Sequence, residues 1–352
     1  MISPRPFRCT ICAIVCAVVG LWPVATAQAQ LGPQVYALSH FFGATRTATV
    51  RGYGMGGAVA CIPGPDSLNP ADAADNKQVA ADVRHLQASF TNSTTFKTNM
   101  VSVALPLGAN GGGQILYSNV KSPTHSSFLA TAFPGSTQKL SEESVGLFYG
   151  HRINPKLALG VSAAPVLATH HVLGAIGAPG IDIHFDGRPI VSQFSKLGGR
   201  VGLDYKFAEW GRFGLIYDNF WERATMTVPP ALAPAGLVTH TANFHAVNLA
   251  GGFNIQPTKK LTLVFEHDKG SLTGDGSGIT GHETYAGAEW MVASALALRV
   301  GRRNGNSTYG LGVTRGNFSL QWAYVNNLAA DQVNPVFGGH NHLNCFEVGY
   351  SF

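Results

Sequence analysis

The stretch Phe318-Ser-Leu-Gln-Trp-Ala-Tyr324 shows most clearly which kind of structure this sequence encodes. Its even-numbered residues are large and apolar, and the residues between them are polar or small. A period of two residues places these two sets of side chains on opposite faces of a β-strand. A helix would instead repeat its apolar positions every three or four residues. The stretch therefore predicts a strand with one apolar face.

The same alternation recurs along the chain, for example at residues 201–207, 261–265 and 296–300. A closed barrel leaves no strand edge unpaired in lipid, and bacterial outer-membrane barrels have an even number of strands. We count about fourteen, near residues 85–92, 98–106, 112–120, 144–152, 157–168, 197–207, 211–220, 242–255, 259–268, 282–290, 294–303, 307–315, 316–326 and 343–352.

The connections between these segments alternate in length. Every even-numbered connection is short, near residues 108–111, 154–156, 209–211, 256–258, 291–293 and 315–317. The long ones all fall at odd positions, at 121–143, 169–196, 221–241, 269–281 and 327–342. Short turns at one end and long loops at the other are typical of outer-membrane barrels. The sequence therefore predicts an all-β fold, a transmembrane antiparallel β-barrel of about fourteen strands.

The composition favours the same class of protein. Only 12% of the residues are charged, compared with about 25% in typical soluble domains. Glycine is frequent, at 42 of 352 residues. Beyond the N-terminal region no apolar run approaches the roughly 20 residues that a membrane-spanning helix needs. A barrel meets all of these observations, because lipid-facing and lumen-facing residues alternate along its strands.

Residues 1–29 have the features of a secretory signal peptide. Arg5 and Arg8 precede an apolar stretch from Ile11 to Trp22, and residues 25–29 offer overlapping A-x-A cleavage sites. Cleavage would lower the net charge from +5 to +3, because both arginines leave and no acid does. A charge this small and scattered argues against nucleic-acid binding.

The mature chain would keep two cysteines, Cys61 and Cys345. They form no disulfide scaffold, although the exported compartment would allow them to pair.

The last seven residues are Phe346-Glu-Val-Gly-Tyr-Ser-Phe352. The alternating apolar residues Phe346, Val348, Tyr350 and Phe352 resemble the C-terminal assembly signal of outer-membrane barrels. We therefore expect a location in the cell outer membrane, with outer-membrane lipid and the barrel-assembly machinery as partners.

Residues 30–84 lack strand alternation and precede the predicted barrel of residues 85–352. They contain Arg51-Gly-Tyr-Gly-Met-Gly-Gly-Ala58, followed by Asp66 and Asn69-Pro-Ala71. Three of these glycines match the nucleotide-binding pattern G-x-G-x-x-G, but the strand, helix and acid of a βαβ unit are missing around them. Successive glycines let a backbone turn tightly and approach other backbone closely. A segment folded inside a barrel needs both properties.

Gly54-Met-Gly-Gly-Ala58, Asp66 and Asn69-Pro-Ala71 together resemble the N-terminal signature of the FadL-type outer-membrane transporters, most closely the PorV/PorQ-like branch. Weaker resemblance continues at 101–107, 285–289 and 296–301. It implies a fourteen-stranded barrel whose N-terminal segment lies in the lumen as a hatch. Well-known members pass hydrophobic molecules across the outer membrane, whereas the PorV-like branch serves protein secretion. The implied hatch motif comprises Arg51, Gly52, Gly54, Met55, Gly56, Gly57, Ala58, Asp66, Asn69, Pro70 and Ala71.

Strand alternation turns seven charged residues toward the lumen: Asp204, Lys206, Asp218, Glu266, Glu289, Arg299 and Glu347. They either line a polar channel and anchor the hatch, or they simply keep a wide lumen hydrated. Arg51 is a candidate partner for one of the acids, which would pin the hatch to the wall.

Other chemistry finds little support in the sequence. His170-His171 and His340-Asn-His342 fall in expected long loops, with no cysteine or HExxH spacing around them, so we expect neither a metal site nor a cofactor. No G-x-S-x-G motif places a nucleophile beside a base, so we expect no enzyme.

Two expected outer loops, at 169–182 and 229–236, are apolar and rich in proline for exposed segments. They fit a capture surface for a hydrophobic ligand, a docking face for a partner protein, or loops packed across the barrel mouth. The favoured hypothesis is passive uptake of a hydrophobic small molecule through a lumen gated by the N-terminal segment. A PorV-like barrel that binds a secreted protein, and a structural barrel with an occluded lumen, are the alternatives.

Overall fold

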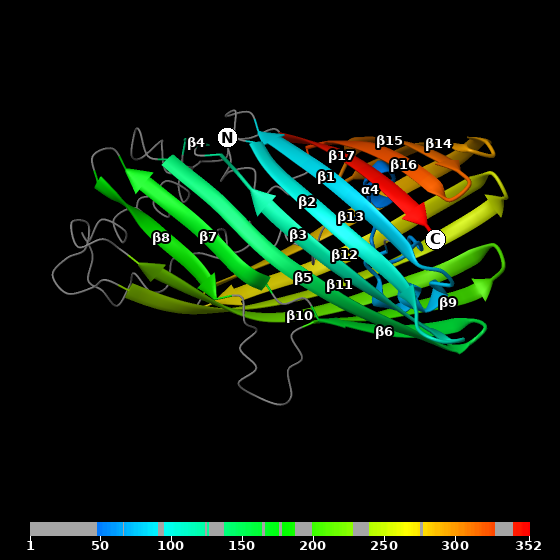
Figure 1. Ribbon diagram of the computed structural model, residues 1–352, viewed down its shortest axis with the longest axis horizontal. Helices are drawn as coiled ribbons and strands as arrows, with labels where there is room; N and C mark the ends of the chain where they lie inside the picture. Colours follow the sequence, from blue (N-terminus) through cyan, green and yellow to red (C-terminus); the bar gives the residue numbers. More distant parts are fainter. Residues whose placement is uncertain are drawn as a thin grey trace, which may run out of the picture.

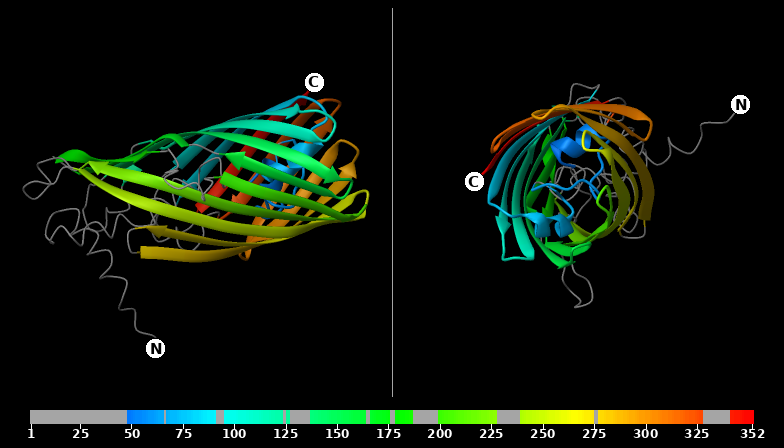
Figure 2. Two further views of the ribbon diagram at one scale, coloured as in Figure 1. Left: turned by 90° about the horizontal axis from the view of Figure 1, so that it is seen from below. Right: turned by 90° about the vertical axis from the view of Figure 1, so that its right-hand side faces the viewer.

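The computed structural model describes residues 48–65, 67–90, 95–123, 125–126, 137–163, 166–175, 178–186, 199–227, 239–274, 277–327 and 341–352. Seventeen strands in these residues form one antiparallel sheet that closes into a barrel (Figures 1 and 2). Strand β1 (Ala80–Phe90) pairs with β17 (Asn341–Ser351) on one side and with β2 (Thr95–Pro106) on the other. The first and last strands therefore complete the ring. The predicted signal peptide lies outside the described residues.

The other strands follow one another around the wall. They are β3 (Gly111–Lys121), β4 (His125–Ser126), β5 (Thr137–Asn154), β6 (Leu157–Ala163), β7 (Val166–Ala175), β8 (Ala178–Asp186), β9 (Gly199–Ala208), β10 (Gly211–Thr227), β11 (Thr239–Thr258), β12 (Leu261–Gly274), β13 (Ser277–Ala293), β14 (Leu296–Arg303), β15 (Asn306–Arg315) and β16 (Phe318–Asn326).

The seventeen strands fill fourteen positions in the wall. Strands β6 and β7 pair with successive parts of β5, so together they act as one interrupted strand. Strands β8 and β9 pair in the same way with successive parts of β10. The two-residue β4 only extends the sheet beside β5. The predicted antiparallel barrel of 14 strands is thereby confirmed.

Several strands are longer than their alternation predicts. The first begins at Ala80 rather than at residue 85. The expected loop at 269–281 is wrong, because β12 continues to Gly274 and β13 begins at Ser277. In these stretches polar residues occupy both faces, so the apolar signal fades while the backbone ladder continues.

The expected loop at 169–196 is also partly wrong, because β7 and β8 form a hairpin within it. His170 and His171 therefore lie on β7, and His342 lies on β17. The segment 229–236 and His340 lie outside the described residues.

The short turns gather at one end of the barrel, on the right in Figure 1, as in the turn that joins β9 to β10. We call this the short-turn end. At the opposite end, β14 and β15 are joined through Asn304 and Gly305, whose φ angles are 45° and 86°. An Asn-Gly pair suits this two-residue hairpin turn, because both central residues need a positive φ.

The wall is apolar outside and polar inside, the reverse of a soluble protein. Along β14 and β17 the exposed side chains are Leu298, Val300, Phe346, Val348 and Tyr350, whereas their neighbours in sequence are mostly buried in the barrel. The predicted C-terminal row of Phe346, Val348, Tyr350 and Phe352 is exposed on the outer surface. Exposed rows of this kind are stable only against lipid or another apolar surface.

Residues 48–65 and 67–79 run inside the barrel near the short-turn end (Figure 2), and we call them the inner segment. They contain the short helix α4 (Val50–Gly54) and the 3-10 helix η2 (Pro70–Asp75). Within the described residues, no helix combines the length and hydropathy that crossing a bilayer would require.

Candidate functional site

The inner segment begins with a helix whose start and end are set by its sequence. The Thr49 hydroxyl accepts a hydrogen bond from the Gly52 backbone N–H at 2.9 Å, as a helix N-cap does. After α4 the chain turns back at Gly56 and Gly57, whose φ angles are 94° and 101°. Only glycine adopts this backbone region without strain. The consecutive glycines of the motif therefore end the helix.

Glycines of the barrel wall leave room for this turn to approach the wall backbone closely. A Cβ atom on Gly287 of β13 would lie 2.5 Å from the Met55 carbonyl oxygen, closer than Cβ atoms are essentially ever found. Gly301 of β14 faces Gly56 in the same way. Thr308 of β15 then binds the turn, since its hydroxyl accepts from Gly56 N–H at 2.9 Å and donates to the Gly54 carbonyl at 3.1 Å. The turn thus lies directly on the backbone of the wall.

Arg51 of α4 reaches the wall at Glu289. Its Nη2 lies 2.6 Å from Glu289 Oε1, and Arg299 Nε lies 2.6 Å from Glu289 Oε2. Arg51 Nη1 also donates to the Pro63 carbonyl at 3.1 Å. Two of the predicted inward charges and Arg51 of the glycine-rich motif therefore meet in one ion triad. Glu289 and Arg299 are buried, so little water screens their ion pair, whereas the Arg51 side chain is partly exposed.

Glu266 of β12 is held by the backbone of the inner segment. Its carboxylate accepts hydrogen bonds from the N–H groups of Val59 at 2.8 Å, Ala60 at 2.7 Å and Cys61 at 3.3 Å. Three converging N–H groups form an anion-binding concavity. Glu266 is fully buried, and these donors replace the water that its charge would otherwise need.

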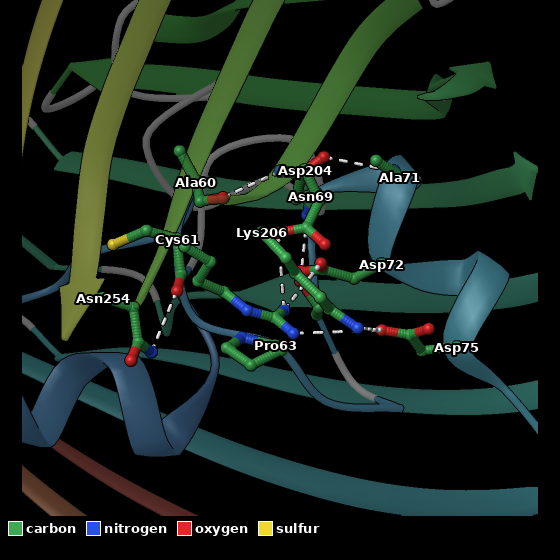
Figure 3. A network of polar contacts seen from close by, with 12 residues as sticks. Ala60, Cys61, Pro63, Asn69, Ala71, Asp72, Asp75, Asp204, Lys206 and Asn254 are labelled. Atoms are coloured by element: carbon green, nitrogen blue, oxygen red, sulfur yellow. Dashed lines mark hydrogen bonds and ion pairs between the residues drawn. The ribbon is translucent and has the colours of Figure 1, made fainter. Parts of the chain in front are cut away.

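Asn69 and Pro70 explain the Asn-Pro-Ala motif. The Asn69 side chain accepts from Ala71 N–H at 3.1 Å and so caps η2, and Pro70 occupies the first position of that helix. The Asn69 amide also donates to the carbonyl of Ala60 at 2.7 Å (Figure 3) and to that of Leu203 at 3.1 Å. One side chain therefore starts the helix and attaches it to β9.

Six charges meet where η2 rests on the wall: Asp72 and Asp75 of η2, Arg152 of β5, Asp204 and Lys206 of β9, and Arg212 of β10. Figure 3 labels Asp72, Asp75, Asp204 and Lys206 of this set. Arg212 Nη1 lies 3.5 Å from Asp72 and 3.6 Å from Asp204. Asp75 binds Arg152 directly and lies 3.4 Å from Lys206 Nζ. Three acids and three bases thus form a compact network across the junction.

The two acids of η2 titrate differently. Burial, and then the nearby Asp204 carboxylate, raises the pKa of Asp72 to about 7. Partial burial also acts to raise the pKa of Asp75, but the cations Lys206 and Arg152 outweigh it and hold that pKa below its usual value. Burial therefore raises the proton affinity of Asp72, whereas the surrounding cations lower that of Asp75.

The remaining predicted inward charges, Asp218 and Glu347, belong to two further ion-pair groups. Arg200 of β9 binds Asp218 of β10 at 2.5 Å and donates to the Leu68 carbonyl at 2.6 Å. Arg84 of β1 lies 3.0 Å from Glu347 and 2.8 Å from Asp82. The predicted Asp66 lies outside the described residues.

Sequence reasoning named some members of these networks and missed others: Asp72, Asp75, Asp82, Arg84, Arg152, Arg200 and Arg212. Arg200 and Arg212 lie on strands whose other inward charges were recognised, so the same strand alternation would have found them.

On the side of the inner segment away from the short-turn end, part of the inner face of the wall is apolar. Val50 and Tyr53 of α4 pack there with buried residues of β1, β2, β3, β5, β16 and β17. We call this set the apolar cluster; its wall residues are Leu86, Ala88, Phe96, Met100, Leu116, Val120, Phe148, Ala323, Val325, Leu343 and Cys345. Beside the inner segment, a cavity of about 340 Å³ is lined by Arg51, Pro63, Glu289, Arg299, Gln321 and Glu347 among others.

Cys61 and Cys345 are both buried, and they form no disulfide with each other. Within the described part of the chain, no three His, Cys, Asp or Glu side chains gather closely enough to hold a metal ion. The contacts described at the site are ion pairs, hydrogen bonds to the backbone and apolar packing.

Comparisons with known proteins bear on the fold. No protein-family model and no curated protein matches the chain. Among solved structures, the monoaromatic hydrocarbon channel CymD is 13% identical with a TM-score of 0.56, over 88% of this chain and 99% of that one. A Pseudomonas aeruginosa FadL homologue is 12% identical with a TM-score of 0.53, over 87% and 98%. The Pseudomonas putida toluene transporter TodX is 14% identical with a TM-score of 0.50, over 88% and 98%.

Identities this low establish an arrangement of strands and leave the activity to be argued from the site. The likeness extends over nearly the whole of each neighbour, so it includes the ring of strands from first to last. The chain therefore shares the barrel fold of FadL-type channels.

Proposed function

We propose that the protein is an outer-membrane channel that lets hydrophobic small molecules cross passively, without a cofactor or a catalytic step. The observation that carries this proposal is the apolar cluster inside a barrel whose lumen is otherwise charged. A channel for ions or sugars has little use for Leu86, Phe96 and Met100 on its inner wall, whereas an apolar solute would exchange water for such a surface. Two of the structural neighbours are described as a monoaromatic hydrocarbon channel and a toluene transporter, which supports the same solute class.

In this proposal a solute enters from the end opposite the short turns and is held by apolar contacts above α4. It leaves beside the inner segment, where the cavity of about 340 Å³ lies. That volume is in the range of sites for small molecules, which start at about 300 Å³. The inner segment acts as the hatch and sets the size of the passage.

The test compares two Phe→Ala variants in liposomes. Phe96 lies in the apolar cluster, and Phe265 is exposed on the outer surface of β12. Phe96→Ala should let larger hydrophobic probes enter the liposomes, because it removes an aromatic ring from the lumen. Phe265→Ala should leave the flux of every probe unchanged. Wild-type flux equal to that of empty liposomes would exclude transport. Equal effects of the two variants would remove the apolar cluster from the path.

The resemblance to the PorV/PorQ-like branch raised protein secretion as a second hypothesis, which stays a prediction. It would gain support if the protein passed no probe but co-purified with exported proteins from its own cell envelope.

A further inference from the structure

Charge is distributed unevenly between the two faces of the barrel wall. Most acids described on the strands face the lumen or the inner segment, among them Asp204, Glu266 and Glu289. Of the strand side chains whose burial is described, Glu143 is the acid that strand alternation turns outward. The outward-facing cations in the same residues are Lys97, Lys121, Lys139, Lys269, Arg302 and Arg315.

Three of these lysines gather on neighbouring strands, and we call Lys97, Lys121 and Lys139 the lysine patch. Strands β2, β3 and β5 lie side by side on the face turned to the viewer in Figure 1. Lys97 lies directly opposite Lys121 in the β2–β3 register, and Lys121 lies opposite Ser141, two residues from Lys139. All three lysines are exposed.

The pairing of Lys97 with Lys121 has an energetic cost. Cβ atoms of directly opposed residues are about 4.5–5.5 Å apart, and like charges at this spacing destabilise the sheet. The nearby acid does not cancel both charges, because Glu143 is a single carboxylate and accepts a hydrogen bond from Asn119 at 2.8 Å. Two exposed cations at opposed positions attract an anion from outside the protein.

The position of the lysine patch along the barrel axis indicates the source of that anion. Toward the short-turn end, the next outward residues on β2 and β3 are Asn99 and Asn119, followed by Val101 and Tyr117. Val101 and Tyr117 belong to the exposed apolar surface. The outer face therefore changes from apolar to cationic within two outward positions on each strand. In a membrane this boundary lies at the level of the lipid head groups.

We propose that the lysine patch binds the phosphate groups of an anionic lipid, whose acyl chains lie against Val101 and Tyr117. Each ammonium group donates up to three hydrogen bonds, and phosphate oxygens are strong acceptors. Asn99, Asn119 and Ser141 add polar groups around the lysines. The patch lies in the half of the barrel away from the short turns, so the lipid belongs to the leaflet on that side. This inference needs the barrel to lie in a membrane and does not depend on transport.

The experiment measures lipid binding to the purified mature protein in detergent by native mass spectrometry. The probe is lipid A, a disaccharide lipid with two phosphates, and the comparison probes are dephosphorylated lipid A and inorganic phosphate. The test variant is Lys97→Gln/Lys121→Gln. The matched control is Lys259→Gln/Lys260→Gln, which removes two exposed lysines from the turn at the opposite end. Lysines near an anionic head group each contribute about a factor of five, so the double variant should bind about 25-fold more weakly.

Binding by the control variant should equal that of the wild type, and dephosphorylated lipid A should bind weakly to all three proteins. Lys97→Arg/Lys121→Arg should retain binding, which separates loss of charge from loss of fold. Equal affinities of the double variant and the wild type would overturn the proposal. So would equal binding of the two lipids, or displacement of lipid A by millimolar inorganic phosphate. Transport of a hydrophobic probe through phosphatidylcholine liposomes should be the same for the variant and the wild type, so the two proposals fail separately.

Discussion

Replacing Gly287 by alanine tests whether the inner segment is fixed against the wall. The new methyl group would lie 2.5 Å from the Met55 carbonyl oxygen and 2.7 Å from its carbon. Both atoms belong to backbone, so no side chain can rotate away. The turn at Gly56 must move instead, and this movement would strain its two hydrogen bonds to Thr308.

The magnitude follows from three opposing effects. Overpacking of a rigid site costs about 1–3 kcal/mol. Weakening of the hydrogen bonds to Thr308 adds about 1 kcal/mol. Alanine in place of glycine in a strand recovers about 0.5–1 kcal/mol of backbone entropy. The net expectation is a loss of about 2 kcal/mol in the free energy of unfolding.

The assay is urea-induced unfolding in detergent micelles, together with limited proteolysis of the inner segment. Gly251→Ala is the matched control, because Gly251 lies on β11 and its new methyl group would meet the flexible side chain of Leu215 at 3.2 Å. Gly251→Ala should leave stability unchanged or raise it slightly. A Gly287→Ala protein as stable as the wild type, with an equally protected inner segment, would refute the close approach of the two backbones.

Three further predictions follow from the same contacts. Glu289→Gln should lower the free energy of unfolding by about 3 kcal/mol, because the buried Arg299 loses its anion. Arg51→Gln should lower it by less, since the Arg51 side chain is 27% exposed, and urea titration of both variants measures the order. The raised pKa of Asp72 means that the folded state binds this proton more tightly than the unfolded chain, so this group's contribution to stability should fall as pH rises from about 4 to about 7; Asp72→Asn should flatten that decline in unfolding midpoints measured at pH 5 and pH 8, and an unchanged decline would remove Asp72 as its source. Cys61 should react with a thiol reagent only after unfolding, because burial and the adjacent Glu266 raise its pKa and keep it a thiol; mass spectrometry of native and unfolded protein, with Cys61→Ser as the control, would reveal any reaction in the native state.

The sequence by itself determined the ring of strands. Successive side chains of a strand point to opposite faces. Alternation of apolar and polar residues therefore predicts a wall with one apolar face toward lipid and one polar face toward the lumen. The same alternation placed Asp204, Glu266 and Glu289 inward without knowledge of any partner. It failed at 269–281, where polar residues occupy both positions of the alternation, and on β7, where the apolar residues come in adjacent pairs and no two-residue period is seen although the backbone ladder continues.

Only the tertiary structure decided what the inward charges do. Arg51 and Glu289 are 238 residues apart, and Val59 and Glu266 are 207 apart, so no local spacing links them. Their pairing depends on closure of the barrel around the inner segment, because only the closed barrel places many strands in contact with this short piece of chain. The fit of Gly287 to the Met55 backbone is likewise invisible in sequence, because a glycine shows only that a side chain is absent and never what occupies its place.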